Sequence, residues 1–238
     1  MSNRNINQLE VLIPARGGSK GLVKKNILDF NNRPLIAWTI KNAIESKCVS
    51  KVFVSTDCDE IASIAERFGA FAIKRPTFIS CDTSSTEEAI EHFLNFTLVN
   101  ESENLCLLQC TSPIRRTNFI DDFFSLHAEG GYDSSLSVSK SHRFFWNVDK
   151  LGQASAKNYE PSARPRRQDI EKENHIYEET GSGYIFSKKG FLQNKSRLFG
   201  RIGLFETMWA ESFEIDTKSD FLVLEKIHKL FIEGELDD

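Results

Sequence analysis

The first half of the chain alternates short apolar runs with amphipathic stretches, and this alternation restricts the possible folds more than any other feature. Short apolar runs predict buried strands, and apolar residues spaced three and four apart predict helices that cover a sheet. Repeated strand–helix–strand units favour an α/β fold in which a mainly parallel sheet lies between two helical layers, with ligands at the carboxyl ends of the strands. The expected strands are Val11–Pro14, Lys51–Ser55, Ala70–Lys74, Asn104–Gln109 and Asp133–Ser139, and the expected helices are Pro34–Lys47, Asp57–Phe68, Thr86–Val99 and Phe119–His127.

A glycine-rich, cationic loop follows the first expected strand. Between Arg16 and Lys25 it holds three glycines and four cations. Glycines let backbone N–H groups approach a ligand closely, and cations neutralise an anion, so the loop is suited to a nucleoside triphosphate. It has neither the order of a Walker A motif nor that of a dinucleotide-binding motif. The competing interpretation is a flexible basic loop without a ligand.

The composition limits the possible partners and compartments. The chain has 238 residues and a formal net charge of −4, so no global basic field attracts nucleic acid and the cationic loop is a local feature. No apolar run is long enough to span a membrane, and Met1 to Glu10 lacks the apolar core of a signal peptide. The five cysteines show no C-x-x-C spacing, which is typical of reduced thiols. We therefore expect a cytoplasmic protein that binds neither nucleic acid nor membrane.

The regular pattern breaks between Lys140 and Glu179. This segment is polar, contains two prolines and carries the run Arg164-Pro165-Arg166-Arg167. A long irregular insertion in a compact domain is usually functional or lies at an interface, although the arginine run alone is equally typical of a solvated surface turn. Regular signals resume with a strand expected at Gly183–Ser187 and a last helix at Lys218–Glu233.

An acidic pair, Glu214 and Asp216, precedes the last expected helix. If Phe213–Ile215 is extended, both carboxylates point to the same side of the chain. Two carboxylates on one side can hold Mg²⁺, which prefers oxygen ligands and often binds nucleotide phosphates as well. The alternative is an ordinary solvated segment in which Asp216 or Thr217 caps the helix.

Eight sequence blocks give the chain a family resemblance. Their order and content are similar to those of the acylneuraminate cytidylyltransferases, also called CMP-sialic acid synthetases, and they extend over nearly the whole chain. The resemblance implies a three-layer, Rossmann-like nucleotidyltransferase fold, with residues 1–238 as one domain and 140–180 as an inserted segment for dimerisation and substrate covering. The blocks are Ile13–Gly21 with Lys25–Ile27, Val54–Asp57, Arg75–Pro76, Asp82–Thr86, Gln109–Pro113, Arg164–Asp169, Gly181–Tyr184 and Glu214–Asp216.

The resemblance also implies a reaction. CMP would pass from CTP to the anomeric hydroxyl of a nonulosonic acid, giving a CMP-activated sugar acid and pyrophosphate. Mg²⁺ would be the cofactor and the protein would be a homodimer. The acceptor stays open among N-acetylneuraminic, legionaminic, pseudaminic and deaminated acids.

The same resemblance implies roles for individual residues, and it singles out Arg16, Lys20, Gln109 and Asp216 as catalytic. The triphosphate would be held by Arg16, Ser19, Lys20 and Lys25, and the cytidine would lie near Asn26, Arg75 and Thr86. The sugar-acid side would be lined by Gln109, Arg167 and Tyr184, and the metal would be bound by Glu214 and Asp216.

Two positions depart from the family pattern. Glu214 stands where the family commonly has aspartate, so Asp216 is the more dependable direct metal ligand. Thr180 precedes Gly181 where the family has asparagine, which bears on the shape of the sugar pocket.

Two other functions remain open from the sequence. One is another sugar nucleotidyltransferase, because glycine-rich cationic first loops occur there too. The other is a non-catalytic nucleotide-binding regulator on the same fold, because fold alone does not determine function. A scan of the four nucleoside triphosphates for pyrophosphate release separates all three.

Overall fold

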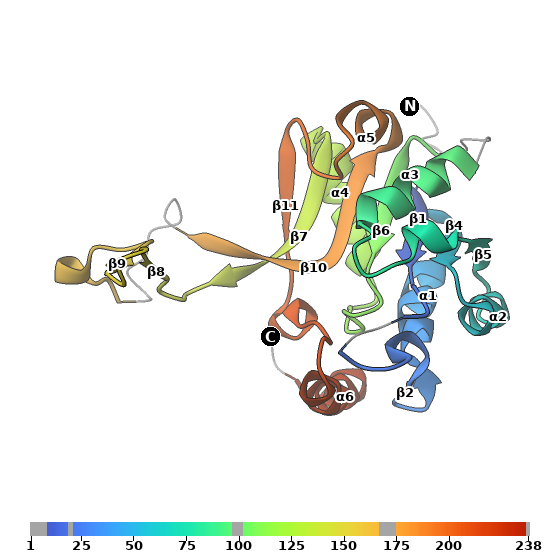
Figure 1. Cartoon of the computed structure of the whole chain (residues 1–238), viewed down its shortest axis with the longest axis horizontal. Helices are drawn as coiled ribbons and strands as arrows, with labels where there is room; N and C mark the ends of the chain where they lie inside the picture. Colours follow the sequence, from blue (N-terminus) through green and yellow to red (C-terminus); the bar gives the residue numbers. More distant parts are fainter. Residues whose placement is uncertain (1–8, 19–20, 97–101, 167–174, 237–238) are drawn as a thin grey trace.

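A seven-stranded sheet forms the centre of the molecule in this computed structural model, which describes residues 9–18, 21–96, 102–166 and 175–236. The strand order is β11-β7-β10-β6-β1-β4-β5 (Figure 1), and β10 alone runs antiparallel to its neighbours within this sheet. The expected mainly parallel α/β fold is therefore confirmed. The strands are β1 (Leu9–Pro14), β4 (Val49–Thr56), β5 (Phe71–Lys74), β6 (Asn104–Leu108), β7 (Ser134–Ser141), β10 (Ile176–Ser187) and β11 (Ile202–Glu206).

Two apolar clusters, one on each face of the sheet, make the three layers. Val11 and Ile13 on β1 belong to the cluster that includes α1, α2 and α4, whereas Leu12 between them belongs to the cluster that includes α3 and α5. Successive side chains of a strand point to opposite faces, so a strand covered on both sides must be apolar throughout. Burial of each such side chain contributes about 1.5–3 kcal/mol. The helices are α1 (Leu35–Glu45), α2 (Asp59–Arg67), α3 (Thr86–Phe96), α4 (Phe119–Gly130) and α5 (Lys188–Asn194).

The last helix, α6 (Lys218–Glu233), packs against residues from the beginning of the chain. It packs in a third cluster that contains Phe30, Ile114 and Ile215. Phe30 lies on a short hairpin formed by β2 (Asp29–Phe30) and β3 (Arg33–Pro34). This packing brings the segment before α6, with the acidic pair, close to the loop after β1.

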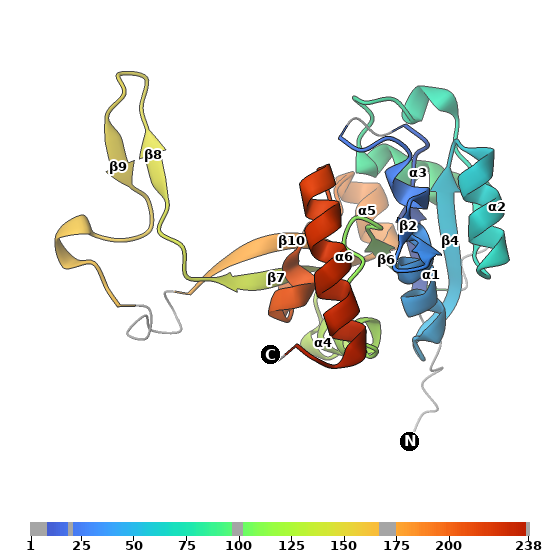
Figure 2. The same cartoon turned by 90° about the horizontal axis from the view of Figure 1, so that it is seen from below.

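The expected insertion 140–180 includes the ends of β7 and β10, and the part between these strands, of which residues 142–166 and 175 are described, forms an arm that extends from the second half of the sheet. Figures 1 and 2 both show its described part standing away from the body, beyond the outer ends of β7 and β10. It contains a hairpin of β8 (Trp146–Val148) and β9 (Ala154–Ala156), so the segment is more regular than its sequence suggested. Within the arm the Phe144 and Tyr159 rings are 4.4 Å apart, and the Arg164 guanidinium lies 4.5 Å from the centre of the Phe144 ring.

Several element boundaries differ from those expected. Strand β10 begins at Ile176 rather than at Gly183, because its first residues pair with β7 outside the apolar core. Helix α1 begins at Leu35, with Pro34 as its N-cap instead of its first residue. Helix α5 and strand β11 were not expected at all. The remaining expected strands and helices are confirmed to within a few residues in the part of the chain described.

Candidate active site

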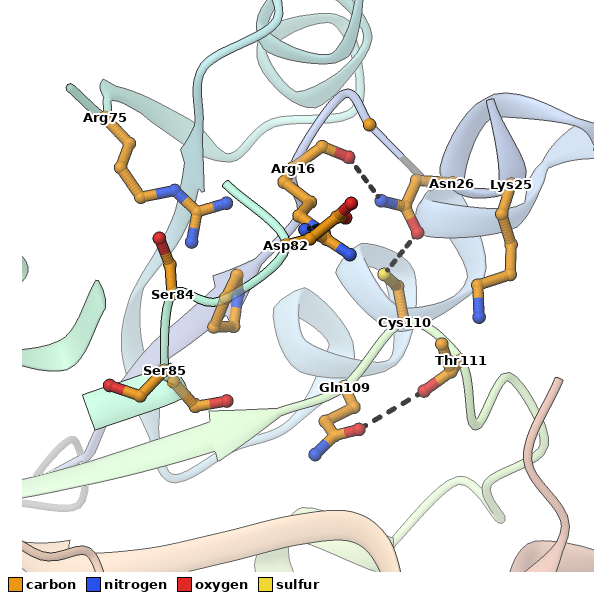
Figure 3. A pocket seen from close by; sticks show the side chains of 13 residues that line it. Arg16, Lys25, Asn26, Arg75, Asp82, Ser84, Ser85, Gln109, Cys110 and Thr111 are labelled. Carbon is orange, nitrogen blue, oxygen red and sulfur yellow. Dashed lines mark hydrogen bonds and ion pairs between the residues drawn. The ribbon is translucent and has the colours of Figure 1, made fainter. Parts of the chain in front are cut away.

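A polar pocket of about 290 Å³ opens where β1 and β6 end at the carboxyl edge of the sheet. Figure 3 shows side chains from four separate segments turned toward it. Six of the residues predicted from the sequence line it, namely Arg16, Lys25, Asn26, Arg75, Thr86 and Gln109. The other lining residues are Pro14, Gly18, Asp82, Ser84, Ser85, Cys110 and Thr111.

The glycines of the first loop have distinct functions. A Cβ on Gly17 would lie 2.8 Å from the Cβ of Cys58, and one on Gly21 would lie 2.2 Å from the carbonyl oxygen of Asp216. Both positions thus need glycine for backbone packing. A Cβ on Gly18 would meet no atom within 4 Å, and Gly18 lines the pocket, so this position leaves space for a ligand. Only Gly18 among these three fits the ligand-approach role predicted for the loop.

Hydrogen bonds fix the loop to the end of β6. The Asn26 side-chain amide donates to the Arg16 carbonyl oxygen at 3.0 Å, and the Cys110 thiol donates to Asn26 Oδ1 at 3.0 Å. Asn26 and Cys110 are both buried, and burial raises the pKa of the Cys110 thiol to about 11. Cys110 is therefore a protonated structural donor at neutral pH, and Asn26 has its polar atoms committed to shaping the pocket (Figure 3).

Three cations converge on the pocket from different elements. Arg16 forms an ion pair with Asp82 at 2.8 Å, and Lys25 contacts the Ile215 carbonyl oxygen at 2.5 Å and Asp216 Oδ1 at 3.4 Å. Arg75 is 6% exposed, and burial lowers the pKa of its guanidinium. The Arg75 Nε is buried without a hydrogen-bond partner among the described residues. A buried donor without a partner is costly, so a polyanion placed here would gain strong charge-assisted bonds.

Gln109, Gly181 and Glu214 meet beside the cationic part of the pocket. The Thr111 hydroxyl donates to Gln109 Oε1 at 3.3 Å, and the Gln109 Nε2 has no hydrogen-bond partner in the described parts of the chain. Gly181 has a φ of +64°, and a Cβ there would lie 1.8 Å from Glu214 Oε1 and 3.6 Å from Gln109 Oε1. The Gln109 amide oxygen and the Glu214 carboxylate thus border the same small space beside Gly181, and the unpaired Nε2 of Gln109 is left to bind a polar acceptor molecule.

The acidic pair has the donor chemistry for a magnesium ion. Ile215 is fully buried, whereas the Asp216 side chain is 73% exposed and Glu214 is half-buried. Burial, and then the charge of Asp216, raises the pKa of Glu214 to about 6. No group of three or more ligating side chains occurs in the described residues, so phosphates and water would complete the coordination, as Mg²⁺ commonly requires. The residues present fit the ion.

Asp216 is not the cap of α6. Thr217 is the N-cap, and its hydroxyl accepts from the Asp220 N–H at 3.2 Å. The Asp220 carboxylate accepts in return from the backbone of Thr217 at 2.7 Å and of Asp216 at 3.1 Å. The helix-capping alternative therefore applies to Thr217, and the Asp216 carboxylate is available for a ligand.

Four predicted site residues lie elsewhere or outside the described residues. Tyr184 is 2% exposed and belongs to the apolar cluster beneath α3 and α5. Its hydroxyl donates to the Glu179 carboxylate, and the Arg197 guanidinium covers its ring. Tyr184 is thus not among the residues that line the pocket. Ser19, Lys20 and Arg167 lie outside the described residues.

The sequence reasoning missed several lining residues. Asp82, Ser84 and Ser85 lie in the Asp82–Thr86 block, for which the family resemblance implied a role only for Thr86. Asp82 is nevertheless the ionic partner of Arg16. An acid and hydroxyls between Arg75 and a helix start, at the same sheet edge as the first loop, are the signal that could have identified them.

Comparisons of the sequence with known proteins identify cytidylyltransferases. A family model described as Cytidylyltransferase matches residues 10–236. N-acylneuraminate cytidylyltransferase A of Danio rerio is 37% identical over 94% of this chain and 51% of its own length, and the N-acylneuraminate cytidylyltransferase of Escherichia coli O18:K1:H7 is 34% identical over 88% and 49%. The chain therefore spans about half the length of these curated relatives.

Solved structures with low sequence identity share the fold. A CMP:2-keto-3-deoxy-manno-octonic acid synthetase complexed with CTP superimposes with a TM-score of 0.69 at 19% identity, covering 96% of this chain and all of its own. The 4-diphosphocytidyl-2C-methyl-D-erythritol synthase of Anaerococcus prevotii gives 0.69 at 12% identity, covering 94% and 100%. Among the described residues, the helices are too short or too polar for any to traverse a bilayer.

Proposed function

The chain belongs to the cytidylyltransferase family, and on this premise we propose that it transfers CMP from CTP to the anomeric hydroxyl of a nonulosonic acid, releasing pyrophosphate. One observation carries the proposal. The pocket brings together three cations and the unpaired amide of Gln109, and the acidic pair lies beside it with Asp216 next to Lys25, so a nucleoside triphosphate, its metal ion and a polar acceptor can bind side by side. The names of the relatives support an N-acylneuraminate as the acceptor.

The residues of the chain would act chiefly by positioning and charge neutralisation. Arg16 and Lys25 lie where they can bind phosphate oxygens and stabilise the charge that develops on the departing pyrophosphate. The acceptor hydroxyl gives up its proton to water, and its oxygen forms a bond to the α-phosphorus as the bond from that phosphorus to the pyrophosphate oxygen breaks. Gln109 would hold the acceptor through its Nε2, which converts an encounter into an oriented reaction. Glu214 and Asp216 would hold Mg²⁺, which supplies polarisation of the phosphate oxygens.

Arg16 can bind phosphate beside Asp82 or in its place, because the ion pair is made by its NH1 group and a guanidinium carries further donors. Both side chains are partly exposed, at 31% and 44%, and exposed ion pairs of this kind contribute only about 0–1 kcal/mol. A triphosphate carries more charge than one carboxylate and can displace Asp82 at small cost. The pair thus keeps Arg16 extended into the pocket before the nucleotide arrives.

Pyrophosphate release from each of the four nucleoside triphosphates, with N-acetylneuraminic acid as acceptor, tests the proposal. We expect CTP to be preferred by about 10⁴-fold, because a site that hydrogen-bonds the cytosine amino group leaves buried groups unpaired against uracil. Equal turnover with UTP would indicate a different sugar nucleotidyltransferase. Nucleotide binding without pyrophosphate release would indicate a regulator.

The arm supports a homodimer as the working form. Phe145, Trp146, Val148 and Leu151 on the arm are 38%, 52%, 68% and 93% exposed. Large apolar side chains on a projection that stands away from its own body have little to pack against unless another molecule covers them. A second copy of this chain is the proposed partner, and a cytoplasmic location is proposed because the five cysteines are unpaired thiols.

A further inference from the structure

Arg115 is a buried cation just behind the pocket. It lies in the loop between β6 and α4 and is 7% exposed. Its NH2 group donates to the carbonyl oxygens of Gln109 at 2.9 Å and of Ser182 at 2.6 Å. Its NH1 group donates to the Thr39 hydroxyl of α1 at 3.2 Å. One guanidinium therefore joins three segments that are distant in the sequence.

The two carbonyls stand at the point where strands β6 and β10 separate. The antiparallel ladder between these strands ends with the pair Gly183 and Leu108. The same register would next pair Ser182 with Gln109, but the Arg115 guanidinium bonds to both of their carbonyl oxygens instead. Arg115 thus takes the place of the missing ladder bond and fixes how far the strand ends lie apart.

Beyond this junction, both strand ends lead to the acceptor side of the pocket. Gln109 carries the free amide donor, and the residue before Ser182 is Gly181, against which Glu214 packs. Strand β10 has a bulge at Thr180–Ser182, where its register with β7 shifts. On its other side this bulge is tied to β7, because the Ser137 hydroxyl accepts from the Gly183 N–H at 2.9 Å and bonds Thr180 Oγ1 at 2.8 Å. The β6 side has Arg115 as its tie.

A guanidinium suits this position better than any other side chain. Its planar fork presents several donors in fixed directions, so one group can bind two carbonyls and a hydroxyl together. Among the described residues no carboxylate lies within ion-pair distance of Arg115, so its charge is balanced by carbonyl dipoles and by more distant acids. Burying a charge without a carboxylate partner costs free energy. This cost argues that Arg115 is present for the geometry it imposes on the two strand ends.

We propose that Arg115 is a positioning residue that sets the acceptor pocket by holding Gln109 and the Gly181 bulge in register. The inference rests on the proposed function and adds a residue outside the pocket lining to the determinants of acceptor binding. The proposed CTP contacts lie on the first loop and on Arg75, and the hydrogen bonds of Arg115 in the described part of the chain go to Thr39, Gln109 and Ser182 instead. Loss of Arg115 should therefore weaken acceptor binding selectively.

The test is the Arg115→Lys variant of the full chain, assayed by pyrophosphate release with CTP and N-acetylneuraminic acid. Lysine keeps the charge but is a single point donor that cannot span both carbonyls and Thr39. We expect the KM for the acid to rise about tenfold or more, since displacements of about 1 Å at a reacting site can cost about a hundredfold. The KM for CTP and the dissociation constant of CTP should change less than about twofold.

The matched control is the double variant Glu10→Gln/Lys188→Met. Lys188, at the start of α5 just after β10, and Glu10, on β1, form a buried ion pair, 6% and 2% exposed, away from the end of β10 that Arg115 contacts. The control should lower the melting temperature without changing either KM. Equal rises in both KM values for Arg115→Lys, or no rise in the KM for the acid, would overturn the inference.

Thr39→Val keeps the inference testable if Arg115→Lys does not fold. This nearly isosteric change removes one partner of the guanidinium and leaves the other two. It should raise the KM for the acid alone, by a smaller factor, and an unchanged KM would again overturn the inference. A wild-type protein that released no pyrophosphate would instead defeat the proposed function itself, so the two failures are distinguishable.

Discussion

Gly181 is the residue at which backbone conformation and the acidic pair meet. Its φ of +64° disfavours any side chain, and Glu214 occupies the space where a Cβ would stand. We expect Gly181→Ala to lose about 1–2 kcal/mol of stability from the left-handed conformation alone, and to lose transferase activity because Glu214 must move. Unfolding in urea and the rate of pyrophosphate release measure the two effects.

Gly152 provides the matched control for this prediction. It lies on the arm with a φ of +82°, and a Cβ there would meet no atom within 4 Å. Gly152→Ala should show a similar backbone cost but retain activity. Equal activity of the two variants would mean that the position of Glu214 is not needed for catalysis.

Asp216 and Thr217 are neighbours with separable functions. Asp216→Asn should lower kcat by about a hundredfold or more, because a metal clamp on phosphate is worth several kcal/mol, and it should leave the melting temperature nearly unchanged. Thr217→Ala should do the reverse, losing about 1 kcal/mol of helix capping with little loss of rate. Glu214→Gln should have a smaller effect than Asp216→Asn. Wild-type rate and Mg²⁺ dependence in Asp216→Asn would show that this carboxylate binds no metal.

Helix α6 is attached to the β2–β3 hairpin by a buried histidine. His228 is 3% exposed, its Nδ1 bonds the Asn31 amide at 2.9 Å, and its ring contacts Trp38 at 4.3 Å between centroids. Burial, and then the charge of Lys41, lowers the pKa of His228 to about 4. The imidazole is thus neutral in the folded chain at pH 5, whereas the unfolded chain would bind a proton there.

The free energy of unfolding should therefore fall as the pH drops below the ordinary histidine pKa of about 6.5. Between pH 7 and pH 5 this one residue should cost about 2 kcal/mol, because the unfolded state binds the extra proton. Urea unfolding at the two pH values measures the loss, and His228→Gln should reduce it. His127 is buried with a lowered pKa as well, so part of the acid sensitivity should persist. An undiminished loss in His228→Gln would contradict the assignment.

The elements that the sequence reveals are those whose whole length lies in the core. Strand β6 is buried from Leu105 to Leu108, and its continuous apolar run predicts it well. Strand β11 lies at the sheet edge, where Ile202 and Leu204 are exposed and only Gly203 and Phe205 are buried, so its pattern resembles a loop. Strand β10 was shortened in the prediction because its bulge at Thr180–Ser182 interrupts the apolar sequence.

The candidate site shows the same division. Pocket residues at strand ends, such as Arg75 and Gln109, could be predicted because parallel strands bring their carboxyl ends to one edge. The burial of Tyr184 could not, because the sequence does not tell on which face of β10 a residue lies once a bulge shifts the register. The role of Arg115 depends on two carbonyl positions, which no pattern of side chains encodes.

For the molecule as a whole, the arm can be removed without breaking the sheet. Ser141 and Ile176 are paired across β7 and β10, so an Asn-Gly turn can join them in place of residues 142–175. We expect the shortened chain to keep its far-ultraviolet circular dichroism and to sediment as a monomer, because it lacks the exposed apolar surface of the arm. A shortened chain that still dimerises would place the interface elsewhere.

Strand β10, which runs antiparallel to the rest of the sheet, marks a division of the chain into two parts whose sequences can vary separately. The described residues that line the pocket all precede position 112, whereas Gly181 and Glu214, on the side proposed for the acceptor, follow the crossover into β7 and β10. Under the proposed function, variation in the later half would alter the choice of acceptor while the earlier half continued to bind the same nucleotide. Arg115 joins the halves at the ends of β6 and β10, and Lys25 with Asp216 and Arg116 with Glu211 join them nearby. A chimera that exchanges the later half between two proteins of this architecture would need to conserve these contacts between the halves to inherit a new acceptor.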